Sequence, residues 1–202
     1  MKQPATRLFL ALALPLLLSS CIGIDADARV GSDGSVDLSM TYTVSSAVDE
    51  LGRLGSNAAY LPLPVGRDDL ELAATRAGGQ LRSWTRKDGD DSFVVVADLR
   101  FPSVAAFASF LDPAGELAVF AEAGGASTLT LRLSAGQKPA DPDLAEFIRL
   151  AFADYMISIR IELPRTPSTS QGFAVSGKVA SFSMKAADLY AAETPVSASV
   201  SW

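Results

Sequence analysis

The sequence of 202 residues contains no histidine and only one cysteine, Cys21. Without histidine, the chain cannot build the Ser-His-Asp or Cys-His arrangements of nucleophilic catalysis, and it lacks the commonest ligand of zinc and other transition metals. With one cysteine, it cannot form an intrachain disulfide. These absences leave carboxylates as the main candidates for enzymatic chemistry, and they give no reason to expect a metal or an organic cofactor.

Long apolar runs are also scarce. The longest, residues 8–18, is interrupted by Pro15 and follows the positively charged Lys2 and Arg7. It is too short to cross a bilayer as a permanent helix, and its layout is typical of a signal peptide. No later segment is long and apolar enough to predict a second membrane span.

The apolar run ends in Leu18-Ser19-Ser20-Cys21, which resembles the bacterial lipobox of an aliphatic residue, two small residues and cysteine. This resemblance implies that residues 1–20 are removed and that Cys21 is acylated, with fatty acids such as palmitate. Multiple acyl chains give stable membrane attachment, since each buried methylene contributes about 0.8 kcal/mol. The alternative is an ordinary secretory signal with an incidental cysteine, but an exported free thiol would be a liability.

Positive charge is in the minority, with 17 Lys and Arg against 23 Asp and Glu, a net charge of −6. Removal of residues 1–20 takes away Lys2 and Arg7 but no acidic residue, so the net charge becomes −8. An acidic surface repels nucleic-acid phosphates and anionic lipid headgroups. We therefore expect no nucleic-acid partner, and we expect membrane contact only through acyl chains or apolar side chains. The expected location is the bacterial envelope, on a periplasmic or surface-exposed face of a membrane.

Alternating apolar and polar residues predict strands that each bury one face. The pattern covers residues 36–42, 128–134, 157–163, 180–184 and 196–202. Turn residues at 31–34 and 87–90, both containing Asp-Gly, predict two hairpins, the second joining strands 81–86 and 92–101. Strand 92–101 is apolar on both faces near its start, which favours a central position in a sheet.

Helical spacing of apolar residues follows Pro142 and predicts an amphipathic helix over 141–155. Its apolar stripe consists of Leu144, Phe147, Ile148, Ala151, Phe152 and Tyr155. A second helix is predicted from Ser103 to residue 111, and weaker ones over 46–54, 68–76 and 186–191. The element order predicts an α+β fold, a mainly antiparallel sheet with helices packed on one face. We expect a membrane tether over 21–28 and a single domain over 29–202.

Four features across most of the mature chain resemble the mycobacterial LppM-type lipoprotein domain. They are the predicted lipidation site Cys21, the Gly34-Ser35-Val36 turn into a strand, the 157–164 strand ending in Leu-Pro, and the closing strand ending at Trp202. Members of that family often continue into a C-terminal transmembrane helix, which is absent up to Trp202. The resemblance implies an α+β surface or periplasmic domain that handles amphiphilic molecules, and it implies no catalytic residues.

Acidic residues occur as three adjacent pairs, Asp49 with Glu50, Asp68 with Asp69, and Asp90 with Asp91. A glycoside hydrolase needs two carboxyl groups facing each other across a groove. Neighbours on a helix or strand point to different sides, so these pairs are interpreted as solvated surface. Asp88, Asp90 and Asp91 around Gly89 also suggest a calcium loop, but position twelve of that loop would be Leu99 instead of a bidentate glutamate. A hairpin turn explains this cluster.

An unusually apolar loop over 57–66 carries Tyr60, Leu61, Leu63 and Val65 between prolines and glycine. Such a loop either packs over the core as a lid or offers a contact surface to a lipid or a protein. A second segment, 113–127, is predicted to be mobile and contains Leu117, Val119 and Phe120.

The sequence therefore favours a non-enzymatic, membrane-anchored envelope lipoprotein that binds either an amphiphilic ligand or an envelope protein. The space under the 141–155 helix is the predicted ligand site. Two alternatives stay open: a carboxylate-dependent hydrolase acting on envelope glycan, and a purely structural lipoprotein.

Overall fold

The computed structural model describes residues 22–45, 66–137, 142–153 and 155–202. The predicted signal peptide and the predicted helix over 46–54 lie outside these residues. Within the described part of the chain, no helix is long and apolar enough to span a membrane.

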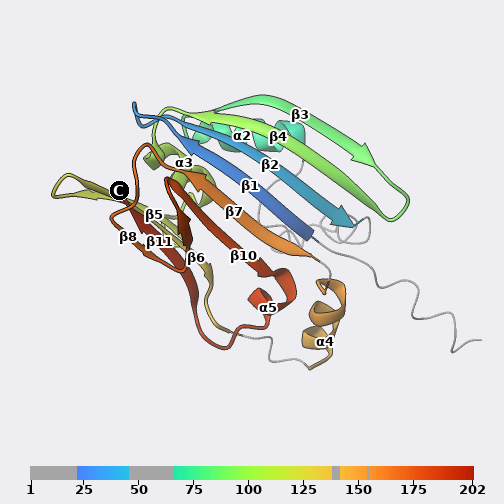
Figure 1. Ribbon diagram of the computed structural model, residues 1–202. Coiled ribbons are helices and arrows are strands. Elements are labelled where there is room, and N and C mark those ends of the chain that lie inside the picture. The colour runs from blue at the N-terminus through green and yellow to red at the C-terminus, as the bar shows by residue number, and fades with distance from the viewer. Residues whose placement is uncertain (1–21, 46–65, 138–141, 154) are drawn as a thin grey trace, which may run out of the picture.

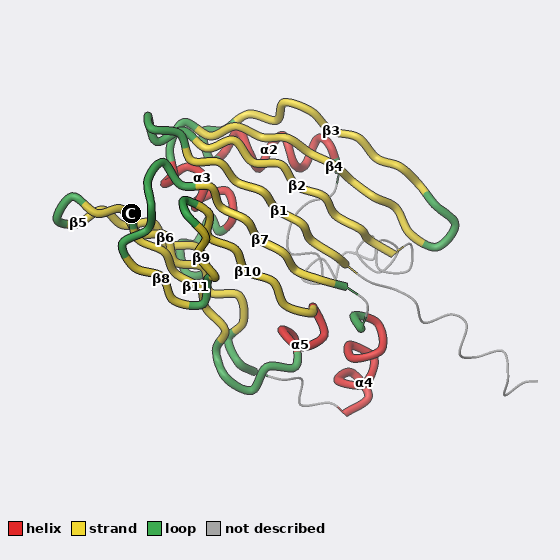
Figure 2. The backbone as a smooth tube through the Cα atoms, in the orientation of Figure 1, coloured by secondary structure: helices red, strands yellow, loops and turns green. Residues whose placement is uncertain are grey.

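Two β-sheets form the body of the protein (Figures 1 and 2). The larger sheet has seven strands in the order β3-β4-β2-β1-β7-β10-β9, and the smaller has four in the order β5-β6-β11-β8. Every ladder between these strands is antiparallel except the one that joins β1 to β7. The mainly antiparallel α+β fold predicted from the sequence is confirmed; the division into two sheets was not predicted.

The strands of the larger sheet are β1 (Ile22–Val30), β2 (Val36–Ser45), β3 (Gln80–Asp88), β4 (Ser92–Phe101), β7 (Met156–Glu162), β9 (Ala174–Ser176) and β10 (Val179–Lys185). The smaller sheet consists of β5 (Ala118–Ala123), β6 (Ala126–Ser134), β8 (Thr169–Gln171) and β11 (Val196–Ser201). All five strands predicted from alternation are present, and β4 lies between β2 and β3 as its two apolar faces predicted.

Four helices are described: α2 (Arg67–Arg76), α3 (Val104–Leu111), α4 (Pro142–Ala151) and α5 (Ala186–Tyr190). The helices α2 and α3 cover one face of the larger sheet (Figure 1). By contrast, α4 and α5 lie near the end of that sheet where β1 begins and β2 ends. The prediction of helices on one face therefore holds for α2 and α3, whereas α4 sits at the end of the sheet.

The core lies on the inner face of the larger sheet, where period-two alternation buries every second side chain. The inward residues of β2 and β4 face each other in register and are each 2% exposed or less: Val36, Leu38, Met40, Tyr42 and Val44 opposite Phe101, Leu99, Ala97, Val95 and Phe93. Strand alternation is therefore what fixes which face of the sheet carries the core.

Several helices and strands begin or end at the residues that the sequence predicted. In the β1–β2 turn, Gly34 has a φ of +82°, and Gly78, just after α2, has a φ of +77°. Both values lie in the left-handed region that glycine adopts without a Cβ clash. The hydroxyl of Ser103 accepts a hydrogen bond from the backbone N–H of Ala106 at 3.1 Å and so caps α3.

Two predicted loops are strands in the structure. The tether predicted over 21–28 is wrong from residue 22 onward, because β1 begins at Ile22 and pairs with β2 on one side and β7 on the other. Its inward positions include Ala26 and Ala28, which alternate with charged residues. Because alanine side chains are small, this apolar–polar alternation is weak in the sequence. Likewise, the segment 113–127 contains β5 and the start of β6.

Candidate functional site

An apolar cavity of about 220 Å³ lies between the inner face of the larger sheet, helix α3 and the smaller sheet. Its described lining residues are Ile24, Ala26, Ala28, Leu38, Met40, Phe107, Leu111, Leu117, Ala118, Leu131, Arg132, Leu133, Ile157 and Ile159. Arg132 is the one charged residue among them. A concave apolar site with a single polar group is typical of ligand pockets.

The floor of the cavity is formed by β1, β2 and β7. Strand register places Ala26 between Met40 of β2 and Ile159 of β7. Because a methyl group stands where its neighbours carry long side chains, the inner face of the sheet is recessed at this position. The cavity therefore follows from a small residue in the middle of a strand whose neighbours are large.

The opposite wall comes from α3 and the smaller sheet, which supply Phe107, Leu111 and Leu131. Helix α3 is held against the larger sheet by aromatic packing, since the ring centroid of Phe101 lies 5.8 Å from that of Phe107 and 5.0 Å from that of Phe110. Aromatic pairs at these distances stabilise a core beyond their buried area. This wall is thus anchored by packing that does not depend on a ligand.

The mouth of the cavity is marked by its two exposed lining residues, Leu117, which is 57% exposed, and Arg132. The backbone N–H of Arg132 donates to the carbonyl of Leu117 at 2.7 Å, and the Arg132 Nη1 donates to the carbonyl of Glu116 at 3.0 Å. The guanidinium has five N–H donors, of which these hydrogen bonds use one. The guanidinium is exposed to solvent and retains donors for an anionic group.

Asp112 fixes the loop that carries Leu117. Its buried carboxylate accepts hydrogen bonds from the backbone N–H groups of Ala114, Leu117 and Ala118. These bonds, led by the one from Leu117, lower the pKa of the Asp112 carboxyl. Because the ionised form accepts these bonds, the entrance is organised at neutral pH.

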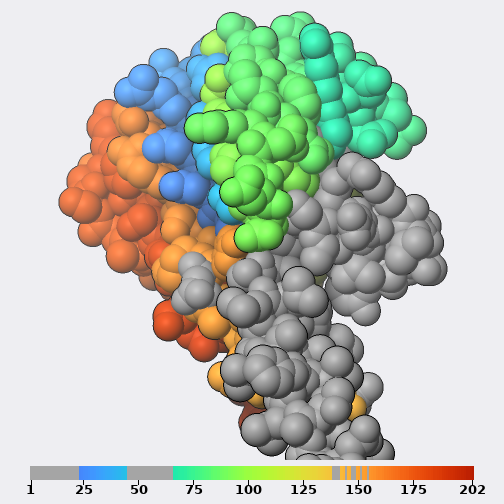
Figure 3. All heavy atoms as spheres, turned by 90° about the vertical axis from the view of Figure 1, so that its right-hand side faces the viewer, coloured from blue at the N-terminus to red at the C-terminus, as the bar shows by residue number. Residues whose placement is uncertain are grey.

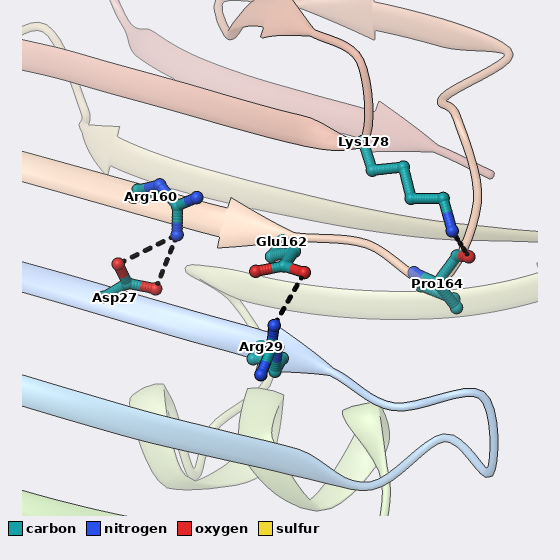
Figure 4. A network of polar contacts seen from close by, with 6 residues as sticks. All are labelled: Asp27, Arg29, Arg160, Glu162, Pro164 and Lys178. Carbon is teal, nitrogen blue, oxygen red and sulfur yellow. Dashed lines mark hydrogen bonds and ion pairs between the residues drawn. The ribbon is translucent and has the colours of Figure 1, made fainter.

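The outer face of the larger sheet carries a second, polar feature, a row of ion pairs between neighbouring strands (Figure 4). Asp27 of β1 accepts two hydrogen bonds from Arg160 of β7 at 3.0 and 3.1 Å, and Arg29 donates to Glu162 at 3.1 Å. Further along, Arg100 of β4 is paired with Asp37 of β2 at 3.1 Å. Each carboxylate in these pairs forms an ion pair with an arginine, so the outer face of the larger sheet is a solvated network of ion pairs.

A shallow depression on this outer face is lined by Asp27, Arg29, Asp37, Leu38, Ser39, Arg82, Asp98, Leu99 and Glu162. Asp98 accepts hydrogen bonds from the hydroxyls of Ser39 and Ser83. The bond from Ser83 and then that from Ser39 lower the pKa of the Asp98 carboxyl. A general acid of a glycoside hydrolase needs the opposite shift.

The adjacent acidic pairs do not gather into a site in the described part of the chain. Asp68 and Asp69 lie in the exposed first turn of α2, and Asp90 and Asp91 lie in and beside the β3–β4 turn; Asp49 and Glu50 lie outside the described residues. The carboxylate of Asp88 accepts a hydrogen bond from Arg86 within the β3–β4 hairpin. Over residues 22–45, 66–137, 142–153 and 155–202, no group of three or more acidic residues, Cys or His could hold a metal ion.

Several predicted site residues cannot be compared with the cavity. The lipobox residues Leu18, Ser19, Ser20 and Cys21, and the apolar loop residues Tyr60, Leu61, Leu63 and Val65, lie outside the described residues. The cavity found here is not the ligand site predicted under helix 141–155, because no described side chain of α4 lines it and α4 lies at the end of the sheet. A site under that helix stays a prediction, since the side chains of most of its apolar stripe lie outside those described. Sequence reasoning missed both Ala26 and Arg132. Arg132 lies in the predicted strand 128–134, whereas the alternation around Ala26 is weakly marked.

Comparisons with known proteins bear on the fold. No protein-family model matches the sequence, and no curated protein matches it. Among solved structures, the chain is similar to the NMR structure of the folded domain of LppM from Mycobacterium tuberculosis, with a TM-score of 0.52 and 14% sequence identity over 93% of this chain and 92% of that chain. The likeness extends over nearly the whole of both chains, so the protein has an LppM-like α+β fold.

Proposed function

We propose that this protein is a non-enzymatic bacterial envelope lipoprotein, acylated at Cys21, whose domain binds a single-chain amphiphile with an anionic head. The observation that carries this proposal is the apolar cavity of about 220 Å³ with Arg132 at its mouth. The chain of the ligand fills the cavity, and its head meets the guanidinium at the entrance.

The size of the cavity supports a single chain. Pockets for drug-sized ligands occupy roughly 300–1,000 Å³, more than the 220 Å³ available here. A water molecule takes up about 30 Å³ of its liquid, and a methylene group is of similar size, so the cavity admits about seven methylenes. At about 0.8 kcal/mol each, their burial contributes about 5 to 6 kcal/mol. Before the costs of association, this corresponds to a Kd on the order of 0.1 mM.

The polar face of the sheet supports binding over hydrolysis. Asp27, Asp37 and Glu162 are each paired with an arginine, and hydrogen bonds lower the pKa of Asp98. A hydrolase acting on envelope glycan needs one carboxyl group that stays protonated near neutral pH, opposite a second that is ionised. Release of reducing sugar from envelope glycan by the purified protein would favour the hydrolase instead.

The proposed lipid anchor is supported by the lipobox residues and by the LppM-like fold, which agrees with the resemblance of the sequence to the LppM-type lipoprotein domain. Growth of the expressing cells with labelled palmitate tests it directly. Incorporation of label into wild type and its absence in Cys21→Ser is the expected result. A purely structural lipoprotein would take up the label in the same way but would bind no amphiphile.

Binding is tested with a series of alkyl carboxylates of increasing length, titrated by calorimetry into the mature chain carrying Cys21→Ser. Affinity is expected to rise about fourfold per methylene, the equivalent of about 0.8 kcal/mol, until about seven methylenes are enclosed, and then to level off. Extraction of the protein purified from cells, with mass spectrometry of the extract, identifies any natural ligand. No binding at any chain length would overturn the proposal and point to an envelope protein as partner.

The role of the guanidinium is tested by Arg132→Gln. Exposed ion pairs contribute about 0.2–1 kcal/mol, so the variant is expected to bind alkyl carboxylates up to about fivefold more weakly while its affinity for neutral alkyl glucosides is unchanged. Arg82→Gln, on the outer face of the sheet, is the matched control and should alter neither affinity. An equal loss for charged and neutral ligands would contradict a role in head-group binding.

A further inference from the structure

Three of the six exposed large apolar side chains in the described part of the chain lie at one end of the molecule. Leu150, Met156 and Tyr190 are 43%, 42% and 37% exposed, respectively. They belong to α4, the first residue of β7 and the last residue of α5, which lie near the end of the larger sheet where β1 begins (Figure 1). Figure 3 turns this end toward the viewer, and orange atoms from the 142–160 region reach the surface there. We call these three residues the apolar end.

Packing contacts join the elements of the apolar end into one unit. The ring centroids of Phe152 and Tyr190 lie 5.0 Å apart, which connects the chain after α4 to α5. The backbone N–H of Ala186 donates to the carbonyl of Tyr155 at 2.8 Å, which connects α5 to the start of β7. These contacts hold the exposed side chains in fixed positions relative to the sheet.

The same unit contacts the start of β1, the part of the described chain nearest to Cys21. A Cβ built on Gly23 would lie 3.0 Å from Cδ1 of Tyr155, so the second residue of β1 packs directly against that ring. Cys21 is two residues before Gly23 and is therefore at most about 7 Å away along the chain. Acyl chains on Cys21 would enter a bilayer beside the apolar end, with no flexible spacer between bilayer and sheet.

We propose that the apolar end rests in the interfacial layer of the membrane that holds the acyl chains. This inference depends on the acylation proposed above. Its occupant is a lipid surface, because the chain leaves the described domain toward Cys21 at this end and because the apolar side chains are exposed next to that exit. The strands of the larger sheet then rise from the membrane, with their 31–34 turn pointing away from it.

The chemistry of the apolar end suits this interface. Tyrosine combines an apolar ring with a polar hydroxyl and is favoured at the boundary between lipid and water. Lys185 lies directly opposite Met156 in the β7–β10 ladder and is exposed. A lysine beside an apolar surface can extend its ammonium group to lipid phosphates. Since the mature chain is acidic overall, apolar contact and this local cation provide the attraction, and long-range charge does not.

The test uses nitroxide labels on the acylated full chain in vesicles of phosphatidylethanolamine and phosphatidylglycerol. Acylation consumes the thiol of Cys21, which is the only native cysteine, so an introduced cysteine takes up the label alone. Met156→Cys reports on the apolar end. Val175→Cys is the matched control, because Val175 is 43% exposed and its strand β9 pairs with residues 179–181, toward the other end of the sheet.

The label at Met156→Cys is expected to show a several-fold loss of collisions with a water-soluble nickel chelate and a gain of collisions with oxygen. The label at Val175→Cys should remain accessible to nickel. Leu150→Cys serves as a second reporter if Met156→Cys does not fold. Equal nickel access at both positions in vesicle-bound, palmitate-labelled protein would overturn the proposed orientation while leaving acylation intact. Protein that neither takes up palmitate nor floats with the vesicles would overturn the acylation, and this inference with it.

Discussion

Replacing Ala26 with leucine is expected to stabilise the protein and to weaken amphiphile binding at the same time. Leucine adds three carbon atoms to a side chain that lines the cavity. At about 0.8 kcal/mol each, their burial contributes about 2.4 kcal/mol, from which side-chain ordering removes about 0.5–1 kcal/mol. The net gain of about 1.5 kcal/mol corresponds to a rise in Tm of roughly 3–6 °C for a chain of this size.

The same three carbons occupy space that the ligand would fill, so alkyl carboxylates lose about 2.4 kcal/mol of burial, a loss in affinity of about fiftyfold. Ala97→Leu is the control, because Ala97 is completely buried, faces Met40 across the β2–β4 ladder and is not among the lining residues. Overpacking there should cost about 1–3 kcal/mol. Urea unfolding and calorimetric titration measure both quantities. The reasoning is refuted if Ala26→Leu is destabilised as much as Ala97→Leu, or if it binds ligand as wild type does.

Substitutions at three further positions probe the surroundings of the site. Asp112→Ala removes the acceptor of three backbone hydrogen bonds and should cost about 1.5–3 kcal/mol in urea unfolding at pH 7. Because the pKa of the Asp112 carboxyl is lowered from 3.8, the difference in stability from wild type should shrink as the pH falls below that value. A stability difference that stays constant with pH would contradict this. Tyr42→Phe should change the free energy of unfolding by less than about 1 kcal/mol, since the acceptor described for its buried hydroxyl is the Met40 Sδ, a weak acceptor, at 3.2 Å; a larger loss would reveal a stronger partner. Ser103→Ala should cost about 1 kcal/mol by removing the cap of α3, and Ser103→Asp should retain most of that stability in thermal unfolding.

Local signals in the sequence were enough to predict most strands. The alternation over 157–163 and 196–202 predicted β7 and β11, and the Asp-Gly turns predicted both hairpins. These predictions succeeded because period-two burial and turn conformation depend on residues close together in the chain. The hairpin at 31–34 implied a short strand ending at Val30, but residues 22–28 of β1 were predicted as a tether, because the alanines at its inward positions mark its apolar face only weakly.

The cavity was not predictable from the sequence because it depends on which strands are neighbours. Ala26 forms a recess only because Met40 and Ile159 lie on either side of it. The first of these neighbours follows from the β1–β2 hairpin, but the second depends on a parallel ladder between distant segments. In the same way, the position of α4 at the end of the sheet depends on its contacts with α5, which the apolar stripe of one helix does not specify.

The parallel pairing of β1 and β7 also determines when the domain can be completed. Arg29 and Glu162, which form an ion pair across these strands, are 133 residues apart in sequence. Closing so long a loop is entropically costly and makes folding slow. Until residues 156–162 are available for pairing, β1 has an open hydrogen-bonding edge in the middle of the future sheet. A chain arrested before β7 should therefore be prone to aggregation and proteolysis.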